Sequence, residues 1–294
     1  MPNRFPLLPL LVALGLWSVA QPASAQAIIP HTLQLNSEQL EQQGLSLAQE
    51  AAQLAQFQQY ELALSRAQLA SQLAPNNSQV WSLLGSLYLQ STELDKGIRS
   101  LERARSLDSK NTAILFALGS AYFQKAQYAK AAEYLQAGLQ LKPDTPGALF
   151  DLGNAYYMLK RYQDAIAQYE SAVKQEPKFW PAINNIGLIR YEQGSVDAAI
   201  KQWRAAVAID AKAAEPQLAL AVALYNKGDR DQGLVLGEKA VELDSRYADT
   251  KFLKENLWGD RLLTDAKKLL DTPRIQATLA RSQNQVVPPQ VSPQ

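Results

Sequence analysis

Apolar residues recur three and four positions apart along most of the chain, a spacing that places their side chains on one face of an α-helix. Residues 146–179 contain two such sets, separated by a short connecting stretch. The first set is Leu149, Leu152 and Tyr156, and the second is Ala165, Tyr169 and Ala172. The pattern therefore predicts two amphipathic helices in this stretch, each with one buried face.

The same pattern returns at a constant interval along the chain. One column of small residues consists of Ala51, Gly85, Gly119, Gly153, Gly187 and Ala221. Twelve places later stand Ala63, Gly97, Ala131, Ala165, Ala199 and Gly233, and seven further on Ala70, Ala104, Gly138, Ala172, Ala206 and Ala240. Three places after the first column are Leu54, Tyr88, Tyr122, Tyr156 and Leu224, with Arg190 as the exception. Columns that stay in register through six blocks without an insertion indicate an internal repeat.

The small residues need a physical cause, because a glycine inside a helix costs about 1 kcal/mol relative to alanine. A close approach of the two helices of each block would supply it. Gly153 is accordingly predicted to face the small side chains of Ala165 and Ala172 in the partner helix. Each block is therefore expected to be a helical hairpin.

Prolines mark the ends of several blocks, since proline cannot continue a helix and disfavours helical geometry in the residue before it. They stand at Pro75, Pro143 and Pro177. With these boundaries the blocks resemble the tetratricopeptide-repeat (TPR) family, and the block PGALFDLGNAYYMLKRYQDAIAQYESAVKQEPKF is the most similar to its consensus. The units are 44–77, 78–111, 112–145, 146–179, 180–213 and 214–247. The resemblance covers about two thirds of the chain and implies an all-α, right-handed superhelical solenoid of six hairpins.

The segments that flank the repeats are expected to cover the ends of the stack, because one hairpin cannot bury its apolar faces alone. Residues 26–43 are interpreted as a linker followed by a short helix. Residues 248–281 are amphipathic and are predicted to form C-terminal capping helices, with the main apolar pattern stopping before Pro273. Residues 282–294 lack a periodic apolar face and contain three prolines, which predicts a disordered tail.

Residues 1–25 have the features of a signal peptide. Arg4 precedes an apolar stretch over 5–20, and Ala-Ser-Ala at 23–25 is the small-residue pattern that signal peptidase accepts. The alternative is an uncleaved membrane anchor, but the stretch is shorter than the roughly 18–20 residues of a membrane span and contains two prolines. We expect cleavage before Gln26, export, and no stable membrane insertion afterwards.

Composition narrows the possible functions further. Apolar residues make up 47% and charged residues 19% of the chain, which favours a packed core over disorder. The chain has 29 basic and 28 acidic residues, and removal of the signal peptide takes away only Arg4, so the charges balance. Nucleic-acid binding, which needs clustered cations, is not expected. The absence of cysteine excludes disulfides and thiolate chemistry.

Catalysis is not expected either. The only histidine, His31, lies in the predicted linker, so a serine or threonine nucleophile in the repeats would lack a histidine base. The carboxylates show no spacing that would pair them across a pocket, and the glycines stand inside helices rather than in a phosphate-binding loop. We predict no catalytic, cofactor-binding or metal-binding residue and keep an enzyme as the least favoured alternative.

The resemblance implies that the first helix of each repeat lines a concave inner surface. The residues predicted to point inward and bind protein are Phe116, Phe123, Phe150, Asn154, Tyr157, Asn184, Asn185, Tyr191 and Tyr225. Aromatic side chains with a polar tip are frequent at interfaces because they bury a large area at low entropic cost. The alternative, that this aromatic ladder only stiffens the stack, stays open.

TPR domains that bind the acidic C-terminal tails of chaperones use two asparagines together with lysine and arginine. Asn154 and Asn185 stand at the two asparagine positions. Phe150 replaces the first lysine, and Glu215 and Ala219 replace the lysine and arginine of the next repeat. A terminal carboxylate would therefore lack its charge-assisted partners, and this type of clamp is not expected.

The exported repeats and the segment LKENLWGDRLLTDAKKLL together resemble exported TPR proteins of cyanobacteria and of the chloroplast lumen. The resemblance implies a periplasmic or thylakoid-lumen scaffold or assembly factor. Its partner would be a protein client whose peptide segment, loop or helix docks in the concave groove, in the context of photosynthetic membrane complexes. The alternative is a structural subunit of a cell-envelope or secretion apparatus. The sequence predicts no particular oligomeric state.

Overall fold

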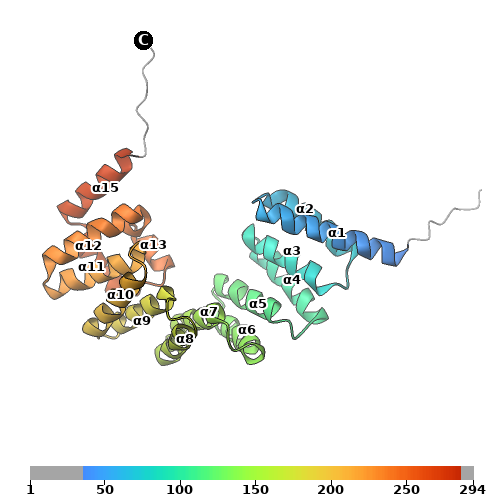
Figure 1. Ribbon diagram of the computed structural model, residues 1–294, viewed down its shortest axis with the longest axis horizontal. Coiled ribbons are helices and arrows are strands. Elements are labelled where there is room, and N and C mark those ends of the chain that lie inside the picture. Colours follow the sequence, from blue (N-terminus) through green and yellow to red (C-terminus); the bar gives the residue numbers. More distant parts are fainter. Residues whose placement is uncertain (1–35, 286–294) are drawn as a thin grey trace, which may run out of the picture. The chain divides into compact units, whose positions relative to one another are not determined.

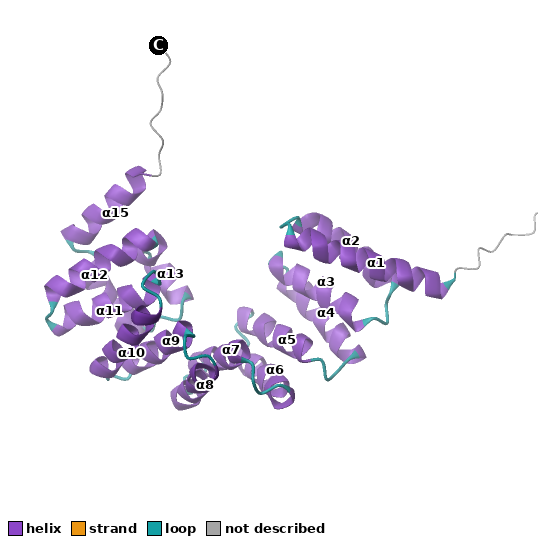
Figure 2. Cartoon of the chain, in the orientation of Figure 1, coloured by secondary structure: helices purple, strands orange, loops and turns teal. Residues whose placement is uncertain are grey.

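Helices account for the regular structure in the part of the chain that the computed structural model describes, residues 36–285 (Figures 1 and 2). All of these helices lie in one compact unit that begins at Ser37. The predicted signal peptide, the predicted linker up to residue 35 and residues 286–294 lie outside the described residues.

The six predicted repeats are six helical hairpins. Their first helices are α1 (Ser37–Gln56), α3 (Ser78–Gln90), α5 (Thr112–Gln124), α7 (Pro146–Met158), α9 (Trp180–Glu192) and α11 (Ala214–Lys227). Their second helices are α2 (Tyr60–Leu73), α4 (Leu94–Leu107), α6 (Tyr128–Leu141), α8 (Tyr162–Gln175), α10 (Val196–Ile209) and α12 (Arg230–Leu243). Each second helix packs against the first helix of its own repeat and, where another repeat follows, against that repeat's first helix (Figure 1). The all-α solenoid predicted from the sequence is confirmed.

Local sequence explains where the helices begin. The side chain of Asn77 accepts hydrogen bonds from the backbone N–H groups of Gln79 and Val80, at 3.0 and 3.1 Å, and so caps α3. Asn111 caps α5 in the same way. Pro146 and Pro181 stand in the first turns of α7 and α9, where a missing N–H costs nothing. Caps and prolines thus start four of the repeats at the predicted boundaries.

The turn inside each hairpin also follows the repeat. Gln58, Thr92, Ala126 and Lys160 adopt left-handed backbone geometry with φ between 57° and 61°. Gly194 and Gly228 occupy the same place in repeats five and six. Backbone bonds such as Glu93 N–H to the Tyr88 carbonyl, at 2.8 Å, close the first helix in a Schellman turn. A residue with a side chain is strained in this geometry, so four of the six turns store strain.

Where the column of small residues in the first helices holds glycine, a large side chain of the second helix packs on it. A Cβ atom added to Gly153 would lie 2.4 Å from Cε1 of Tyr169, and one added to Gly187 would lie 2.5 Å from Nε1 of Trp203. The side chain nearest to Gly153 is therefore the Tyr169 ring, which the sequence analysis did not predict. The small column twelve places later also approaches the first column, since the Gly97 carbonyl oxygen would lie 3.1 Å from a Cβ atom added to Gly85.

The residue in the first column and the residue sixteen positions later change together from repeat to repeat. The pairs, sixteen positions apart, are Ala51 with Ala67, Gly85 with Leu101, Gly119 with Leu135, Gly153 with Tyr169, Gly187 with Trp203, and Ala221 with Gly237. Wherever the first position is alanine, the second is small. Where the first position is glycine, the second is leucine, tyrosine or tryptophan, so the absent side chain leaves room for a large one, as close packing of a protein interior requires.

The ends of the stack differ in part from the predicted boundaries. Residues 37–43 form the first turns of α1 and are continuous with the first repeat. After α12 come a 3₁₀ helix (Ser245–Ala248), α13 (Thr250–Glu255), α14 (Asp260–Leu270) and α15 (Pro273–Gln285). Pro273 begins α15 instead of ending the helical region, because proline fits the first turn of a helix. The predicted disordered tail is wrong for residues 282–285, which are helical.

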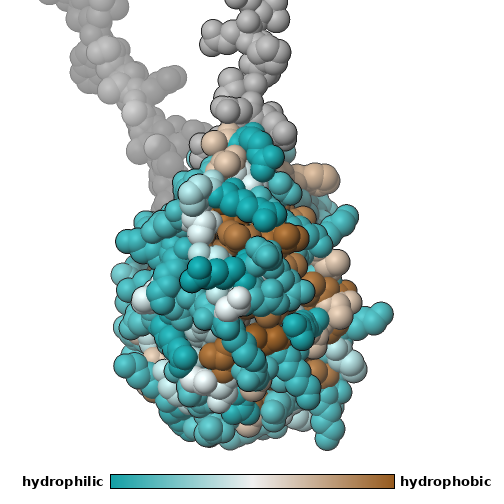
Figure 3. Space-filling view, turned by 90° about the vertical axis from the view of Figure 1, so that its left-hand side faces the viewer, coloured by the Kyte–Doolittle hydropathy of each residue, from teal (hydrophilic) through white to brown (hydrophobic). Residues whose placement is uncertain are grey.

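Two of the C-terminal helices cover different surfaces. α15 packs on α12, where the fully buried Ile275 approaches Gly237, and so covers the end of the stack. α14 packs on α9 and α11. On the side of the molecule shown in Figure 3, hydrophilic residues predominate and hydrophobic residues form patches between them. Within residues 36–285, no helix combines the length and apolar character needed to cross a membrane.

Candidate functional site

The predicted binding residues all lie on first helices. We call the surface formed by α3, α5, α7, α9 and α11, which α14 covers on α9 and α11, the first-helix face. Several predicted rings instead turn toward a second helix: Phe116 approaches Gly138 of α6, and Phe150 packs on Tyr169 of α8. Of the predicted residues, five are half-buried: Phe116, Phe123, Phe150, Asn154 and Tyr225. Four are buried: Tyr157, Asn184, Asn185 and Tyr191. The predicted set is therefore not a uniformly exposed ladder.

Each ring of the ladder packs within its own repeat. The Phe123 ring meets Tyr128 edge to face with centroids 5.2 Å apart, and Tyr157 lies 5.8 Å from Tyr162. Phe150 contacts Tyr169 at 5.7 Å and Phe179 at 5.4 Å. Rings at these separations stabilise the hairpin beyond their area of burial. These contacts support a structural role for the ladder, and its role in binding stays a prediction.

The two asparagines at the clamp positions bond to each other. Asn154 Oδ1 accepts a hydrogen bond from Asn185 Nδ2 at 2.9 Å and another from the Tyr169 hydroxyl at 2.7 Å. Asn185 Oδ1 accepts from Asn184 Nδ2 at 3.1 Å. The amides thus connect repeats four and five within the protein. Their side chains are committed to this network, and Asn185 is buried.

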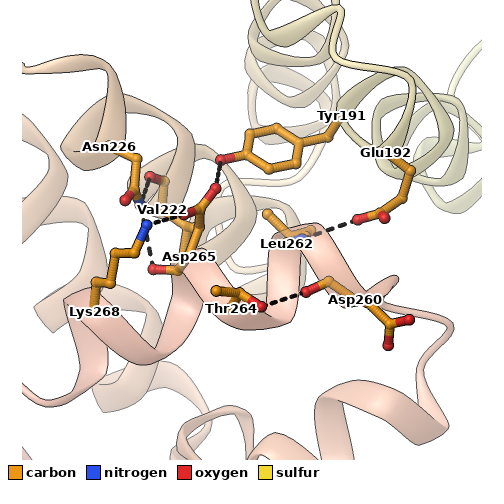
Figure 4. Close-up of polar contacts among 9 residues, drawn as sticks. All are labelled: Tyr191, Glu192, Val222, Asn226, Asp260, Leu262, Thr264, Asp265 and Lys268. Atoms are coloured by element: carbon orange, nitrogen blue, oxygen red, sulfur yellow. Dashed lines mark hydrogen bonds and ion pairs between the residues drawn. The ribbon is translucent and has the colours of Figure 1, made fainter.

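A helix of the same chain occupies the first-helix face of repeats five and six (Figure 4). The Tyr191 hydroxyl donates a hydrogen bond to Asp265 Oδ2 at 2.7 Å, and Asn226 Nδ2 donates to the Asp265 backbone carbonyl at 3.2 Å. Burial and the hydrogen bond to Asp265 raise the pKa of Tyr191, which keeps the phenol protonated as the donor. α14 is therefore anchored to two repeats at once.

Glu192 holds the start of α14. Its carboxylate accepts hydrogen bonds from the backbone N–H groups of Leu262, at 2.9 Å, and Arg261, at 3.2 Å. A carboxylate at a helix N-terminus accepts hydrogen bonds from otherwise unpaired N–H groups and interacts favourably with the positive end of the helix dipole. A Cβ atom added to Gly259 would lie 2.3 Å from Cδ of Glu192, so a side chain at position 259 would displace this carboxylate.

The connection before α14 is buried as well. The Trp258 indole, 3% exposed, donates a hydrogen bond to Glu215 Oε1 at 3.2 Å. Burial of the Glu215 carboxyl raises its pKa to about 7. The side chain of Asn184 adjoins it, and Asn184 Oδ1 has no hydrogen-bond partner among residues 36–285. A series of hydrogen-bonded polar side chains thus extends from repeat four through repeats five and six to the C-terminal segment.

The first-helix face is consequently divided into two parts. In repeats five and six the corresponding side chains are buried: Asn185, Leu188, Ala219 and Val222. In repeats two to four the equivalent positions, Ser86, Ala117, Ser120, Asp151 and Asn154, are half-buried or exposed. We call these the covered part and the open part. The open part is the surface available to another molecule.

The open part is mildly polar with apolar borders. The Ser120 hydroxyl donates to Asp151 Oδ2 at 3.3 Å, and burial raises the pKa of the Asp151 carboxyl. A groove of about 390 Å³ between α1 and α3 is lined by apolar residues that include Leu45, Val80 and Leu83. Among the described residues, no group of histidine and acidic side chains is arranged to hold a metal ion.

Sequence reasoning missed the covered part. It assigned residues 248–281 to the end of the stack, and only α15 has that position. The available signal was the apolar stripe of α14, in which Leu262, Ala266 and Leu269 are fully buried. That stripe indicates a helix with one buried face, but the sequence does not show which surface the face covers.

The architecture defines a helical-repeat protein, built from hairpins of constant length that share faces with their neighbours. Two family models, each described as a TPR repeat, match the chain: one at residues 82–146 and 116–178, the other at residues 187–228. The chain therefore belongs to the tetratricopeptide-repeat family, as the sequence analysis predicted.

Solved structures show the same fold. MamA is 24% identical, with a TM-score of 0.51, and the match covers 56% of this chain and 96% of MamA. YrrB, described as a TPR protein with an unusual peptide-binding site, is 20% identical with a TM-score of 0.50. The match covers 69% of this chain and 98% of YrrB. PilF of Pseudomonas aeruginosa is 16% identical with a TM-score of 0.61, and the match covers 75% of this chain and 98% of PilF. A comparison with curated proteins found no match.

Proposed function

We propose that this protein is a protein-protein interaction scaffold that holds a helix of a client on the open part of the first-helix face. One observation carries the proposal: α14, an amphipathic helix, already docks on the equivalent positions of repeats five and six. The fold similarity to YrrB, a TPR protein with a peptide-binding site, supports a peptide or protein as the ligand.

The contacts of α14 indicate how a client helix would bind. Its apolar stripe at Leu262, Ala266 and Leu269 follows the spacing by which amphipathic helices lie in grooves. Asp265 on the same helix accepts the hydrogen bond from Tyr191. In the open part, the half-buried Ser120 and Asn154 stand at the positions that Leu188 and Val222 occupy in the covered part. The half-buried Phe116 and Phe150 stand four positions before them. A client helix with small and apolar residues three and four apart fits this surface.

The test is a quantitative pull-down of the client from the native membrane fraction, followed by binding of the purified client. Ala117→Arg combined with Ser120→Arg places two long charged side chains on the open part, and client recovery should fall about tenfold. Ala129→Arg, which adds one such side chain at an exposed position of α6, is the control and should leave recovery unchanged. Equal recovery with all variants would overturn the proposal. Tyr191→Ala is unsuitable, because Tyr191 anchors α14.

The proposed cellular context is export to the periplasm or thylakoid lumen, with a client among photosynthetic membrane complexes or their assembly machinery. It rests on the residues 1–25 and on the resemblance of the segment around α13 and α14. Mass spectrometry of the protein from its source should find Gln26 as the first residue. Recovery with an outer-envelope or secretion complex instead would favour the alternative, a structural subunit of such an apparatus.

A further inference from the structure

A second groove lies away from the first-helix face, between the second helices of repeats one and two. α2 and α4 form its walls and α3 its floor, and its volume is about 610 Å³. The amides of Gln68 and Gln72 stand on the α2 side. The half-buried rings of Trp81 and Tyr88 stand on the floor.

The α4 wall of this groove is cationic. Lys96, Arg99 and Arg103 stand three and four positions apart, so they share one face of α4 over about 10 Å. None of the residues that line the groove is acidic. The three charges therefore add up along one wall with no carboxylate facing them inside the groove.

Internal contacts leave much of this charge uncompensated. Lys96 pairs with Glu93 at the rim and lies 5.4 Å from the centroid of the Tyr88 ring. Arg103 Nη2 donates to the Pro75 carbonyl at 3.2 Å, which orients its guanidinium without neutralising it. Arg99 is exposed, and the acidic residue that its charge acts on, Asp95, forms its ion pair with Lys125 instead. Two guanidinium groups thus remain available for an anion.

The repeat provides an internal comparison. The same groove recurs two repeats later between α6 and α8, lined by Gln136, Gln140, Leu149, Leu152, Tyr156 and Gln168. There the positions equivalent to the three cations hold Asp164, Ala167 and Ser171. The hairpins pack without the cations in that groove, so packing does not explain them in the first.

We propose that this cationic groove binds an acidic peptide segment of a protein partner. Glutamate or aspartate side chains would pair with Arg99 and Arg103, whose planar guanidinium groups bind carboxylates in a bidentate manner. Apolar side chains of the same segment would pack on Trp81 and Tyr88. The groove lies on the second-helix side, so this site is separate from the client surface proposed above.

The test uses the full chain and two labelled peptides of the same length, one with glutamates three and four positions apart among leucines and one with glutamines instead. Fluorescence polarisation at about 0.1 M salt, where charges are screened beyond ~10 Å, should show the acidic peptide binding at least about tenfold more tightly. Arg99→Gln combined with Arg103→Gln should remove this preference, while circular dichroism stays unchanged.

The control changes the net charge equally in the groove that lacks the cations. Ala167→Glu combined with Ser171→Glu also lowers the charge by two and should leave binding unchanged. Equal loss of acidic-peptide binding in both double variants would overturn the proposal. So would equal affinity of the unmodified protein for the glutamine peptide and the acidic peptide. Equal affinity for a single-stranded oligonucleotide would overturn it too, because it would show a non-specific response to negative charge. Ala117→Arg with Ser120→Arg should not affect this peptide, which separates the two sites.

Discussion

The pair Gly153 and Tyr169 permits a direct test of how the hairpins are packed. In Gly153→Ala the new Cβ would lie 2.4 Å from Cε1 and 2.6 Å from Cδ1 of the tyrosine ring. The ring would have to move by about 1 Å to restore ordinary contact between carbon atoms. It has little room to do so, because Tyr169 is fully buried and its hydroxyl donates to Asn154.

The expected magnitude follows from opposing terms. Overpacking of a core costs about 1–3 kcal/mol, and weakening the hydrogen bond from the Tyr169 hydroxyl to Asn154 costs about 1 kcal/mol more. Alanine returns about 1 kcal/mol through its better helix propensity. We therefore expect a net loss of about 1–3 kcal/mol in the free energy of unfolding, which lowers Tm by about 2–12 °C for a domain of this size.

Urea unfolding followed by circular dichroism measures this loss, and two further variants make the test specific. Gly147→Ala, where nothing lies within 4 Å of the new Cβ, should stabilise the protein slightly. In a Tyr169→Ala background, Gly153→Ala should also become stabilising, because this pair recreates Ala51 with Ala67 of repeat one. The reasoning is refuted if Gly153→Ala behaves like Gly147→Ala, or if the Tyr169 background does not reverse its sign.

Three further outcomes are expected. Thr92 has φ of 61°, so Thr92→Gly should raise the free energy of unfolding by about 1 kcal/mol, measured in urea. Tyr191→Phe removes the donor to Asp265, and hydrogen exchange in α14 should accelerate about fivefold, the equivalent of about 1 kcal/mol. The pKa of Glu215 rises from 4.5 to about 7, so the folded state binds its proton more tightly. Stability should fall by about 3 kcal/mol as pH rises from about 4.5 through about 7, and Glu215→Gln should abolish this dependence.

The hairpin boundaries could be predicted from the sequence because caps and prolines repeat with the apolar pattern. α3, α5, α7, α9 and α11 each begin at the first residue of a predicted block. These features act within a few residues of each other along the chain, and a periodic column shows them directly.

The partner of the glycine column could not be predicted in the same way. The position sixteen places later varies between alanine, leucine, tyrosine, tryptophan and glycine, so it forms no visible column. The relation between the two positions appears only when both are compared in space. The sequence located the small residues correctly but did not show that a large side chain packs on the glycines.

The docking of α14 was beyond sequence reasoning for a similar reason. Tyr191 and Asp265 are 74 residues apart, and nothing in the apolar stripe of α14 distinguishes the end of the stack from the first-helix face. Tyr157 and Tyr191 were expected to contact a client, and the structure places both among the buried residues.

The anchoring of α14 on repeats five and six has a mechanical consequence. In a plain solenoid each hairpin touches only its neighbours, so hairpins can be removed one at a time from an end. Here Tyr191 and Glu192 of repeat five are tied directly to a helix that follows repeat six. A chain stretched from its N-terminus should give way in small steps until repeat five, and the remaining C-terminal block should then rupture in one larger event.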